Sequence, residues 1–197
     1  PETAIEAHLQ VARRHGATLQ FDAPVSGWEA TGNTAACVHL AGGGRFATRN
    51  LALCMGPWFV DYAATLGVQL RVQRNVQMWF DAPQRFAVGS LPVFFVDRPD
   101  YPKQLYGFPD IGEGVKAAFH GYGETTRPQS LQRDVSAAEV DEVRYALNEF
   151  LPGAGGTLLA SKVCMYSLTP DEHFVIARLG QAPNVVVAGG FSGHGFK

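Results

Sequence analysis

Two stretches near the end of the chain decide the fold, residues 161–176 (SKVCMYSLTPDEHFVI) and residues 184–197 (NVVVAGGFSGHGFK). In the second stretch, residues 185–188 form a short apolar run rich in β-branched side chains, which is typical of a strand buried in a layered α/β sheet. Four glycines follow within seven residues, and glycine lets the backbone approach a flat or anionic ligand while offering unpaired N–H groups. A polar ligand is therefore expected at this corner, although a tight turn would account for the same glycines.

The composition describes a globular protein. A chain of 197 residues can bury a sizeable core, and 46% hydrophobic with 17% charged residues excludes a disordered chain. A net charge of −2 gives no reason to expect binding to nucleic acid or to an anionic membrane surface. No apolar run approaches the roughly 20 residues of a transmembrane helix, and residues 1–4 (PETA) do not resemble a signal peptide, so a cytoplasmic location is the default expectation.

The cysteine and histidine patterns predict no metal site. The cysteines are odd in number and lack a C-x-x-C pair: Cys37, Cys54 and Cys164. Neither a disulfide framework nor a zinc site is indicated. We interpret residues 171–173 (DEH) as a surface turn in which a carboxylate accepts hydrogen bonds from backbone amides.

The remaining chain shows helical and strand periodicities in turn. The expected elements are a helix at 3–15, a strand at 18–21, a three-stranded meander of 25–30, 34–40 and 45–54, a helix from Pro57 to about Leu66, strands at 70–80, 93–96, 104–108 and 115–120, and a helix at 137–151. Ser136 and Glu139 have the spacing of a capping box at the start of the last helix.

Three segments of the sequence carry a more specific signal. Cys164-Met165-Tyr166, residues 169–176 (TPDEHFVI) and residues 190–197 (GFSGHGFK) resemble the C-terminal region of the monomeric sarcosine oxidase and N-methyltryptophan oxidase family. Those proteins are flavoenzymes of the D-amino-acid-oxidase-like superfamily. The resemblance implies an FAD-dependent enzyme that oxidises a secondary amine to an imine and reduces dioxygen to hydrogen peroxide. Sarcosine, N-methyltryptophan, pipecolate and a glycated amino acid would each fit as substrate.

The resemblance also implies a domain arrangement within an α/β fold that carries an α+β insert. Residues 1–70 are expected to form part of a Rossmann-like FAD-binding domain with a β-meander. Residues 71–158 are expected to form an inserted mixed-sheet substrate domain, and residues 159–197 return to the FAD-binding domain. Family members carry a G-x-G-x-x-G turn near their N-terminus, which these residues lack, so the chain is expected to be an internal or C-terminal fragment.

Cys164 is the implied attachment point for the flavin, through its 8-methyl carbon. Without the resemblance, a buried cysteine would simply pack as a small apolar side chain. The other residues that the resemblance places beside FAD are Met165, Val25, Gly56, Trp58, Gly193, His194, Gly195, Phe196 and Lys197.

Lys116 and His120 lie four residues apart on an expected strand, so their side chains point to the same face. The resemblance implies that Lys116 activates dioxygen, since a fixed cation stabilises the anion that develops as dioxygen is reduced. It implies that Tyr106 and His120 contact the amine, that Lys197 pairs with the substrate carboxylate, and that Tyr166 closes the pocket. As isolated residues, all five would also suit ordinary surface or packing roles.

Two other functions are compatible with the sequence. One keeps the fold but passes electrons to a quinone or carrier, as in a dehydrogenase; Lys116 and Cys164 favour the oxidase. The other is a catalytically silent fragment or a binding module, for which the missing nucleotide-binding turn is the argument.

Overall fold

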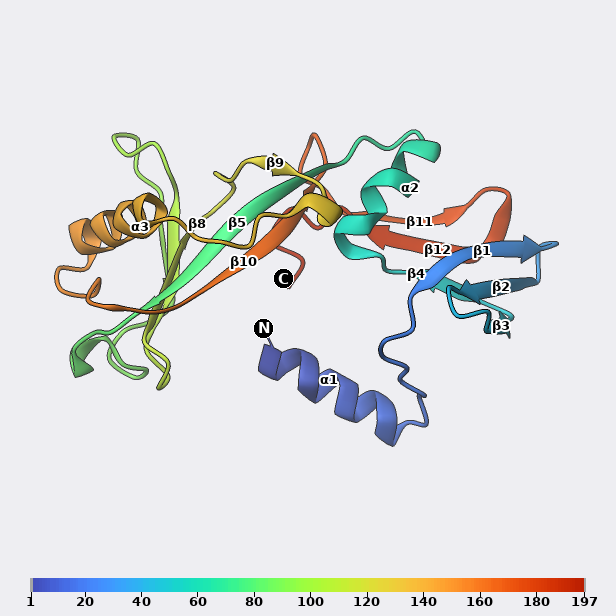
Figure 1. The fold of residues 1–197 in the computed structure, drawn as a ribbon, viewed down its shortest axis with the longest axis horizontal. Helices are drawn as coiled ribbons and strands as arrows, with labels where there is room; N and C mark the ends of the chain where they lie inside the picture. The colour runs from blue at the N-terminus through green and yellow to red at the C-terminus, as the bar shows by residue number, and fades with distance from the viewer. Residues whose placement is uncertain (1, 197) are drawn as a thin grey trace. The chain divides into compact units, whose positions relative to one another are not determined.

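The computed structural model describes residues 2–196 (Figure 1). These residues divide into two compact units. The first unit contains the residues up to Ala52 together with Arg178–Val186, and the second contains Leu53–Ala177 together with the residues from Val187 onward. The fold is mixed α/β with several sheets, as the sequence predicted. None of the helices within residues 2–196 has the length and apolar character needed to cross a membrane.

The part of the first unit that ends at Thr48 consists of one helix and a small antiparallel sheet. Helix α1 spans Glu2–Arg14 and buries none of its residues. Strands β1 (Val25–Thr31), β2 (Ala35–Leu40) and β3 (Arg45–Thr48) pair in the order β1-β2-β3. The predicted meander is therefore confirmed, with short turns at both joints.

Two expectations for this part of the chain are wrong. Residues 18–21 form no strand, because the chain that follows Gly16 (φ +84°) pairs with no strand among the described residues, and an isolated strand has no ladder to stabilise it. The third meander strand does not continue to residue 54. It ends at Thr48, whose hydroxyl donates to the Asn50 carbonyl over 2.8 Å and closes a turn. Strand β4 (Leu51–Leu53) then belongs to a separate sheet.

That separate sheet has the order β11-β12-β4, with β11 at Val175–Leu179 and β12 at Ala182–Gly189. On β12, Val185 and Val187 are buried, whereas the residue after each of them is only half-buried. The apolar run near the end of the chain is thus a strand, as predicted, with one face more deeply buried than the other.

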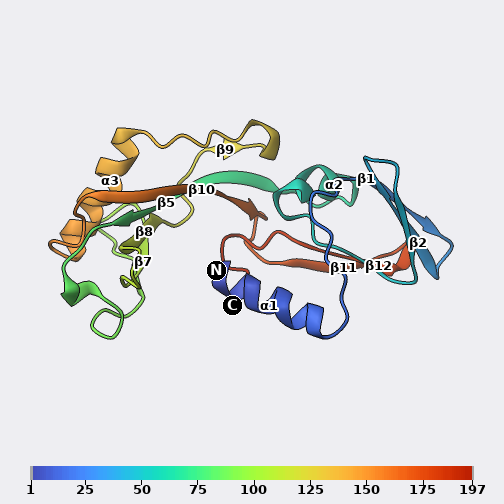
Figure 2. The ribbon, with the colours of Figure 1, turned by 60° about the horizontal axis from the view of Figure 1, so that its bottom comes forward.

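The second unit is built around a six-stranded sheet with the path β10-β5-β8-β7-β6, in which β9 also pairs with β5. Its strands are β5 (Arg71–Phe80), β6 (Phe94–Val96), β7 (Leu105–Phe108), β8 (Val115–Phe119), β9 (Thr125–Thr126) and β10 (Leu158–Leu168). The longest pairing joins β5 and β10 in antiparallel register, and the two strands run side by side in Figures 1 and 2. The four strands predicted between residues 70 and 120 are confirmed.

Helix α3 (Ala137–Phe150) packs on one face of this sheet. Ser136 Oγ accepts a hydrogen bond from the backbone N–H of Glu139 (3.3 Å), and the Glu139 carboxylate accepts one from the backbone N–H of Ser136 (2.8 Å), which confirms the predicted capping box. The core between helix and sheet is apolar: Met78, Phe80, Phe86, Leu105, Val115, Ala117, Val140, Val143, Ala146, Leu147 and Ala154.

Short helices complete the second unit. They are the 3-10 helices η1 (Gly56–Trp58), η2 (Gln84–Phe86) and η3 (Pro128–Ser130) and the α-helix α2 (Phe59–Thr65). The helix predicted to start at Pro57 is present, with a 3-10 first turn. Phe59 is fully buried against Gly189, where a Cβ atom would lie 2.3 Å from the ring, so only glycine fits there.

Candidate active site

The sheet of the second unit has a polar face on the side opposite helix α3. Residues directly opposite each other on paired strands share a face, and side chains alternate along each strand. Lys116 on β8 pairs with Trp79 on β5 and with Phe108 on β7, whereas the neighbouring Ala117 belongs to the core under α3. We call the polar side the site face. It carries Gln77, Trp79, Tyr106, Phe108, Lys116, His120, Cys164 and Tyr166.

Hydrogen bonds join the two ends of the site face. The side-chain amide nitrogen of Gln77 lies 3.5 Å from the hydroxyl of Tyr106 and 3.6 Å from Sγ of Cys164. The hydroxyl of Tyr166 lies 3.5 Å from Nδ1 of His120. Four residues that the sequence singled out separately therefore lie in one cluster: Tyr106, His120, Cys164 and Tyr166. Gln77 was not predicted, because a polar residue in an alternating strand carries no signal of its own.

Lys116 is held between two aromatic rings. Its Nζ lies 4.9 Å from the centre of the Trp79 ring and 5.5 Å from that of Phe108, and the residue is only 8% exposed. The negative faces of the rings attract the ammonium group. The result is a positive charge fixed in position between two aromatic rings.

Burial controls the ionisation of the other groups. Burial raises the pKa of the Cys164 thiol, while the charge of Lys116 and the hydrogen bond from Gln77 oppose that rise. Burial also raises the pKa of the Tyr106 and Tyr166 hydroxyls. Both phenols are therefore neutral hydrogen-bonding groups at physiological pH.

Aromatic rings surround His120. Its ring centre lies 5.9 Å from that of Phe95, 6.4 Å from that of Tyr106 and 5.5 Å from that of Tyr166. An imidazole enclosed in this way is restricted to a narrow range of orientations, so the group can present a fixed nitrogen to a small polar molecule.

The glycine-rich loop forms a cavity of about 250 Å³ against β10. Gly193 adopts φ +80°, and a Cβ atom there would lie 2.3 Å from the Tyr166 ring. Ser192 N–H donates to the Ser167 carbonyl over 2.9 Å and ties the loop to the strand. The cavity is lined by Gly56, Pro57, Met165, Tyr166, Ser167, Gly189, Gly190, Phe191, Ser192, Gly193 and Gly195.

The backbone N–H of His194 is already used within the glycine-rich loop. Its N–H donates to the Phe191 carbonyl (2.9 Å), its Nε2 lies 3.0 Å from the Glu172 carbonyl oxygen, and its ring packs 4.9 Å from Phe174. The nearby turn is as predicted, since His173 N–H donates to the Asp171 carboxylate over 3.1 Å.

Several predicted residues lie elsewhere. Val25 belongs to the first unit and is 60% exposed. Trp58 and Phe196 belong to the second unit and are also exposed, whereas Gly56 lines the loop cavity. Lys197 lies outside the described residues.

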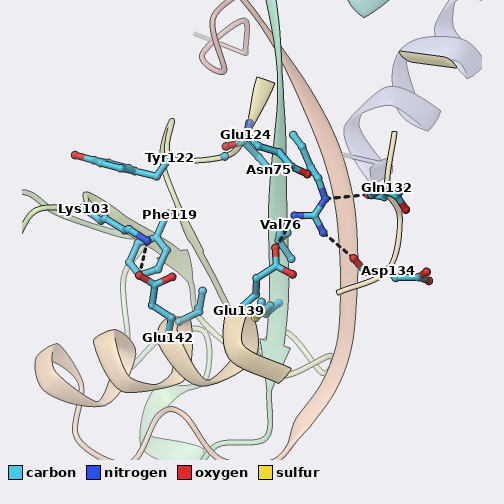
Figure 3. Close-up of a pocket in the computed structure, with 14 residues that line it drawn as sticks. Asn75, Val76, Lys103, Phe119, Tyr122, Glu124, Gln132, Asp134, Glu139 and Glu142 are labelled. Carbon is cyan, nitrogen blue, oxygen red and sulfur yellow. Dashed lines mark hydrogen bonds and ion pairs between the residues drawn. The ribbon is translucent and has the colours of Figure 1, made fainter. Parts of the chain in front are cut away.

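A second cavity, of about 400 Å³, has Arg74 in its lining. Figure 3 shows Gln132, Asp134 and Glu139 around it. The buried guanidinium donates to the carbonyls of Gln132 (2.9 Å) and Asp134 (2.7 Å) and to the Glu139 carboxylate (2.5 Å). These bonds attach the segment before α3 to the sheet. We assign Arg74 a structural role, because each of its three guanidinium nitrogens already donates to an acceptor of the protein.

Within residues 2–196, one group of three potential metal ligands occurs, outside the site face. Glu29, Cys37 and His39 in the first unit place their ligand atoms within 4.8 Å of one another, and Nε2 of His39 lies 3.3 Å from the Glu29 carboxylate. Arg45 on β3 lies directly opposite His39 on β2. The contact between His39 and Glu29 accounts for the approach of these two side chains, so this cluster carries no metal assignment.

The fold is found in enzymes that oxidise amino acids. L-proline dehydrogenase from P. horikoshii matches with a TM-score of 0.79 and 20% identity over 98% of this chain and 50% of that chain. NikD, an amino acid oxidase essential for nikkomycin biosynthesis, matches with a TM-score of 0.75 and 20% identity over 95% of this chain and 51% of that chain. The fold class is therefore that of amino acid oxidases and dehydrogenases.

The chain belongs to the FAD dependent oxidoreductase family, whose model matches residues 1–197. It is 38% identical to monomeric sarcosine oxidase of Streptomyces avermitilis, over 100% of this chain and 52% of the relative. It is 34% identical to N-methyl-L-tryptophan oxidase of Salmonella arizonae, over 100% of this chain and 52% of the relative. The resemblance stated from the sequence is thus confirmed, and the chain spans about half the length of these relatives.

The residues around the glycine-rich loop fit FAD. The N–H groups of Gly193 and Gly195 make no hydrogen bond to other described residues, so they can donate to the carbonyl groups of a flat heterocycle. Side chains at these positions would collide with Tyr166 and Phe191. Met165 and Tyr166 both line the cavity. Tyr166 also lies on the site face, together with Cys164 and Lys116.

Proposed function

We propose that the whole protein oxidises the secondary amine of an N-methyl amino acid, such as sarcosine or N-methyltryptophan, and reduces dioxygen to hydrogen peroxide. The observation that carries this proposal is the site face, on which a buried lysine, a cysteine, a histidine and two tyrosines meet beside the glycine-rich loop. When bound, FAD accepts two electrons from the amine and passes them to dioxygen.

Lys116 would stabilise the negative charge that develops on dioxygen. A cation that is already fixed between aromatic rings needs no reorganisation when that charge appears. Its burial also weakens screening by water, so the electrostatic effect is larger than that of a surface lysine.

Tyr106, Tyr166 and His120 would form the substrate wall. Their rings offer apolar surface and cation–π attraction to an amine, and the contact between the Tyr166 hydroxyl and Nδ1 of His120 fixes both polar tips. We propose Lys197 as the partner of the substrate carboxylate, on the basis of the sequence resemblance.

Cys164 would hold the flavin covalently. Its thiol lies on the same face as Lys116, whose charge favours the thiolate, the reactive form of cysteine. The other proposed contacts with FAD are Met165, Val25, Gly56, Trp58, Gly193, His194, Gly195 and Phe196.

The division into residues 1–70, 71–158 and 159–197 also stays a proposal. Residues 159–168 belong to β10, which extends the sheet of the middle segment by pairing with β5.

The experiment is intact mass under denaturing conditions with peptide mapping around Cys164, on protein from the whole reading frame made in a flavin-sufficient host. We expect a flavin adduct on the Cys164 peptide, its loss in Cys164→Ser, and its retention in a Cys54→Ser control, because Cys54 is exposed and outside the site face. Peroxide release with a panel of N-methyl amino acids then identifies the substrate. Colourless protein with unmodified Cys164 would rule the proposal out.

A dehydrogenase is the second candidate, favoured by the shared fold with L-proline dehydrogenase. It predicts yellow protein that an amine bleaches under anaerobic conditions but that releases no peroxide when air is admitted. Recovery of colour only with an added quinone would select this function.

A further inference from the structure

One glutamine on the site face has no part in the function proposed above. Gln77 lies on β5, the strand between β10 and β8, and its side chain reaches Cys164 in one direction and Tyr106 in the other. We propose that Gln77 is a positioning residue that holds the Cys164 thiol and the Tyr106 hydroxyl with the two N–H groups of a single amide, and that it favours the thiolate of Cys164. The role of Gln77 in the enzyme rests on the proposed function, whereas its contacts with Cys164 and Tyr106 do not depend on that function.

The strand register explains both contacts. Gln77 pairs directly with Lys162 on β10, so Cys164 is its diagonal neighbour, within reach of a long side chain. Tyr106 lies two strands away on β7, opposite Ala118 of β8. Because Ala118 presents only a methyl group, the amide of Gln77 can reach over β8 to the tyrosine.

The chemistry of the amide fits these partners. A primary amide nitrogen carries two donors, and both the Tyr106 hydroxyl oxygen and the Cys164 sulfur can accept. A donor aimed at sulfur stabilises its negative charge, which counteracts the effect of burial on the thiol. Gln77 therefore acts in the same direction as Lys116 on the ionisation of Cys164, and it also fixes the distance between the thiol and a predicted substrate-binding hydroxyl.

The test measures thiol ionisation without flavin. The whole protein is produced in a riboflavin-starved host, and alkylation of Cys164 by iodoacetamide is followed from pH 6 to 11, a range set by the ordinary thiol pKa of about 8.5. Peptide mass spectrometry separates Cys164 from Cys37 and Cys54. The variants are Gln77→Leu, which removes both donors, and Gln77→Glu, which keeps the shape.

We expect Gln77→Leu to raise the alkylation midpoint of Cys164 by about one pH unit, which slows alkylation at neutral pH roughly tenfold. Gln77→Glu should raise it further, because a carboxylate adds like charge beside the thiolate. The matched control is Gln69→Leu, an exposed glutamine just before β5, which should leave the midpoint unchanged.

An unchanged midpoint in Gln77→Leu, with a wild-type melting curve, would overturn the inference. Should Gln77→Leu fail to fold, Gln77→Met decides the question, because it removes both donors, keeps the length of the side chain and adds no charge. Supplying FAD to wild-type protein separates the two proposals. A shifted midpoint without any flavin adduct supports the role of Gln77 and rejects the covalent linkage, whereas normal adduct formation with unchanged midpoints rejects the role of Gln77 alone.

Discussion

Gly193 packs against the ring of Tyr166 so closely that a Cβ atom at position 193 would lie 2.3 Å from Cε2 of the tyrosine. The glycine also has φ +80°, a conformation that strains other residues. One contact therefore links the glycine-rich loop to a side chain of the site face, and both residues line the loop cavity.

Gly193→Ala should destabilise the protein by about 2 kcal/mol or more, because the strained backbone and the displaced Tyr166 ring both cost free energy. Urea unfolding measures this, and flavin content of the whole protein should fall in parallel. Gly180→Ala is the control: nothing lies within 4 Å of a Cβ atom there. Equal stability of the two variants would show that the loop adapts freely.

Lys116→Met should slow the reaction of reduced enzyme with dioxygen by roughly 10²–10³-fold, as expected when a preorganised charge is removed. Anaerobic reduction by substrate should change much less. Lys162→Met is the matched control, since Lys162 also lies near the Trp79 ring, at 5.8 Å, but is exposed. Stopped-flow absorbance separates the two half-reactions, and equal effects of both variants on reoxidation would contradict the role of Lys116.

Glu139→Gln should reduce stability in a pH-dependent way. Burial alone would raise the pKa of Glu139, but the bonds from Arg74 and Ser136 outweigh it and lower the pKa. A lowered folded-state pKa stabilises the protein above the unfolded value of about 4.3, and that stabilisation is lost as pH falls through the folded pKa. The difference between wild type and Glu139→Gln should thus be about 1–2 kcal/mol at pH 7 and shrink below about pH 4.

Urea unfolding at several pH values checks this behaviour. Asp141→Asn on the same helix is the control, because Asp141 forms an exposed pair with Arg144 whose contribution should stay below about 0.5 kcal/mol. A Glu139→Gln penalty that is constant from pH 3 to 7 would mean that the carboxylate charge is irrelevant there.

Gln73→Leu should loosen the loop that follows His120. The buried Gln73 amide donates to the carbonyls of Gly121 (2.9 Å) and Gly123 (2.8 Å), and its loss leaves both without that donor. We expect a loss of about 2 kcal/mol in the free energy of unfolding and faster hydrogen exchange at residues 121–124. Gln104→Leu, which removes one bond to the exposed Asp97, should have little effect. Unchanged exchange in Gln73→Leu would contradict the proposed anchoring.

The structure also shows why some of the site was predictable. Lys116 with His120, and Cys164 with Tyr166, share a face because strand side chains alternate with a period of two, which is a local rule. The capping box at Ser136 likewise depends on residues three apart. Each of these pairs could be assigned from short stretches of sequence.

Gln77 and the ends of the third meander strand were not predictable in that way. Gln77 contacts a residue 87 positions away, and that contact exists only because β5 pairs with β10 in one particular register. A shift of one residue would turn Gln77 toward the core under α3. The break after Thr48 depends on whether the chain continues in one sheet or enters another, which periodicity does not encode.

The sequence by itself determined the family, the identity of most strands and helices, and which residues carry the proposed chemistry, because motifs and periodicity are properties of neighbouring residues. Only the tertiary structure decided that Cys164, Lys116, Tyr106, His120 and Tyr166 meet on one face, that rings enclose the Lys116 ammonium, and that Gln77 bridges the thiol and the hydroxyl. Those arrangements follow from strand register and burial, which arise when distant segments pair and exclude water.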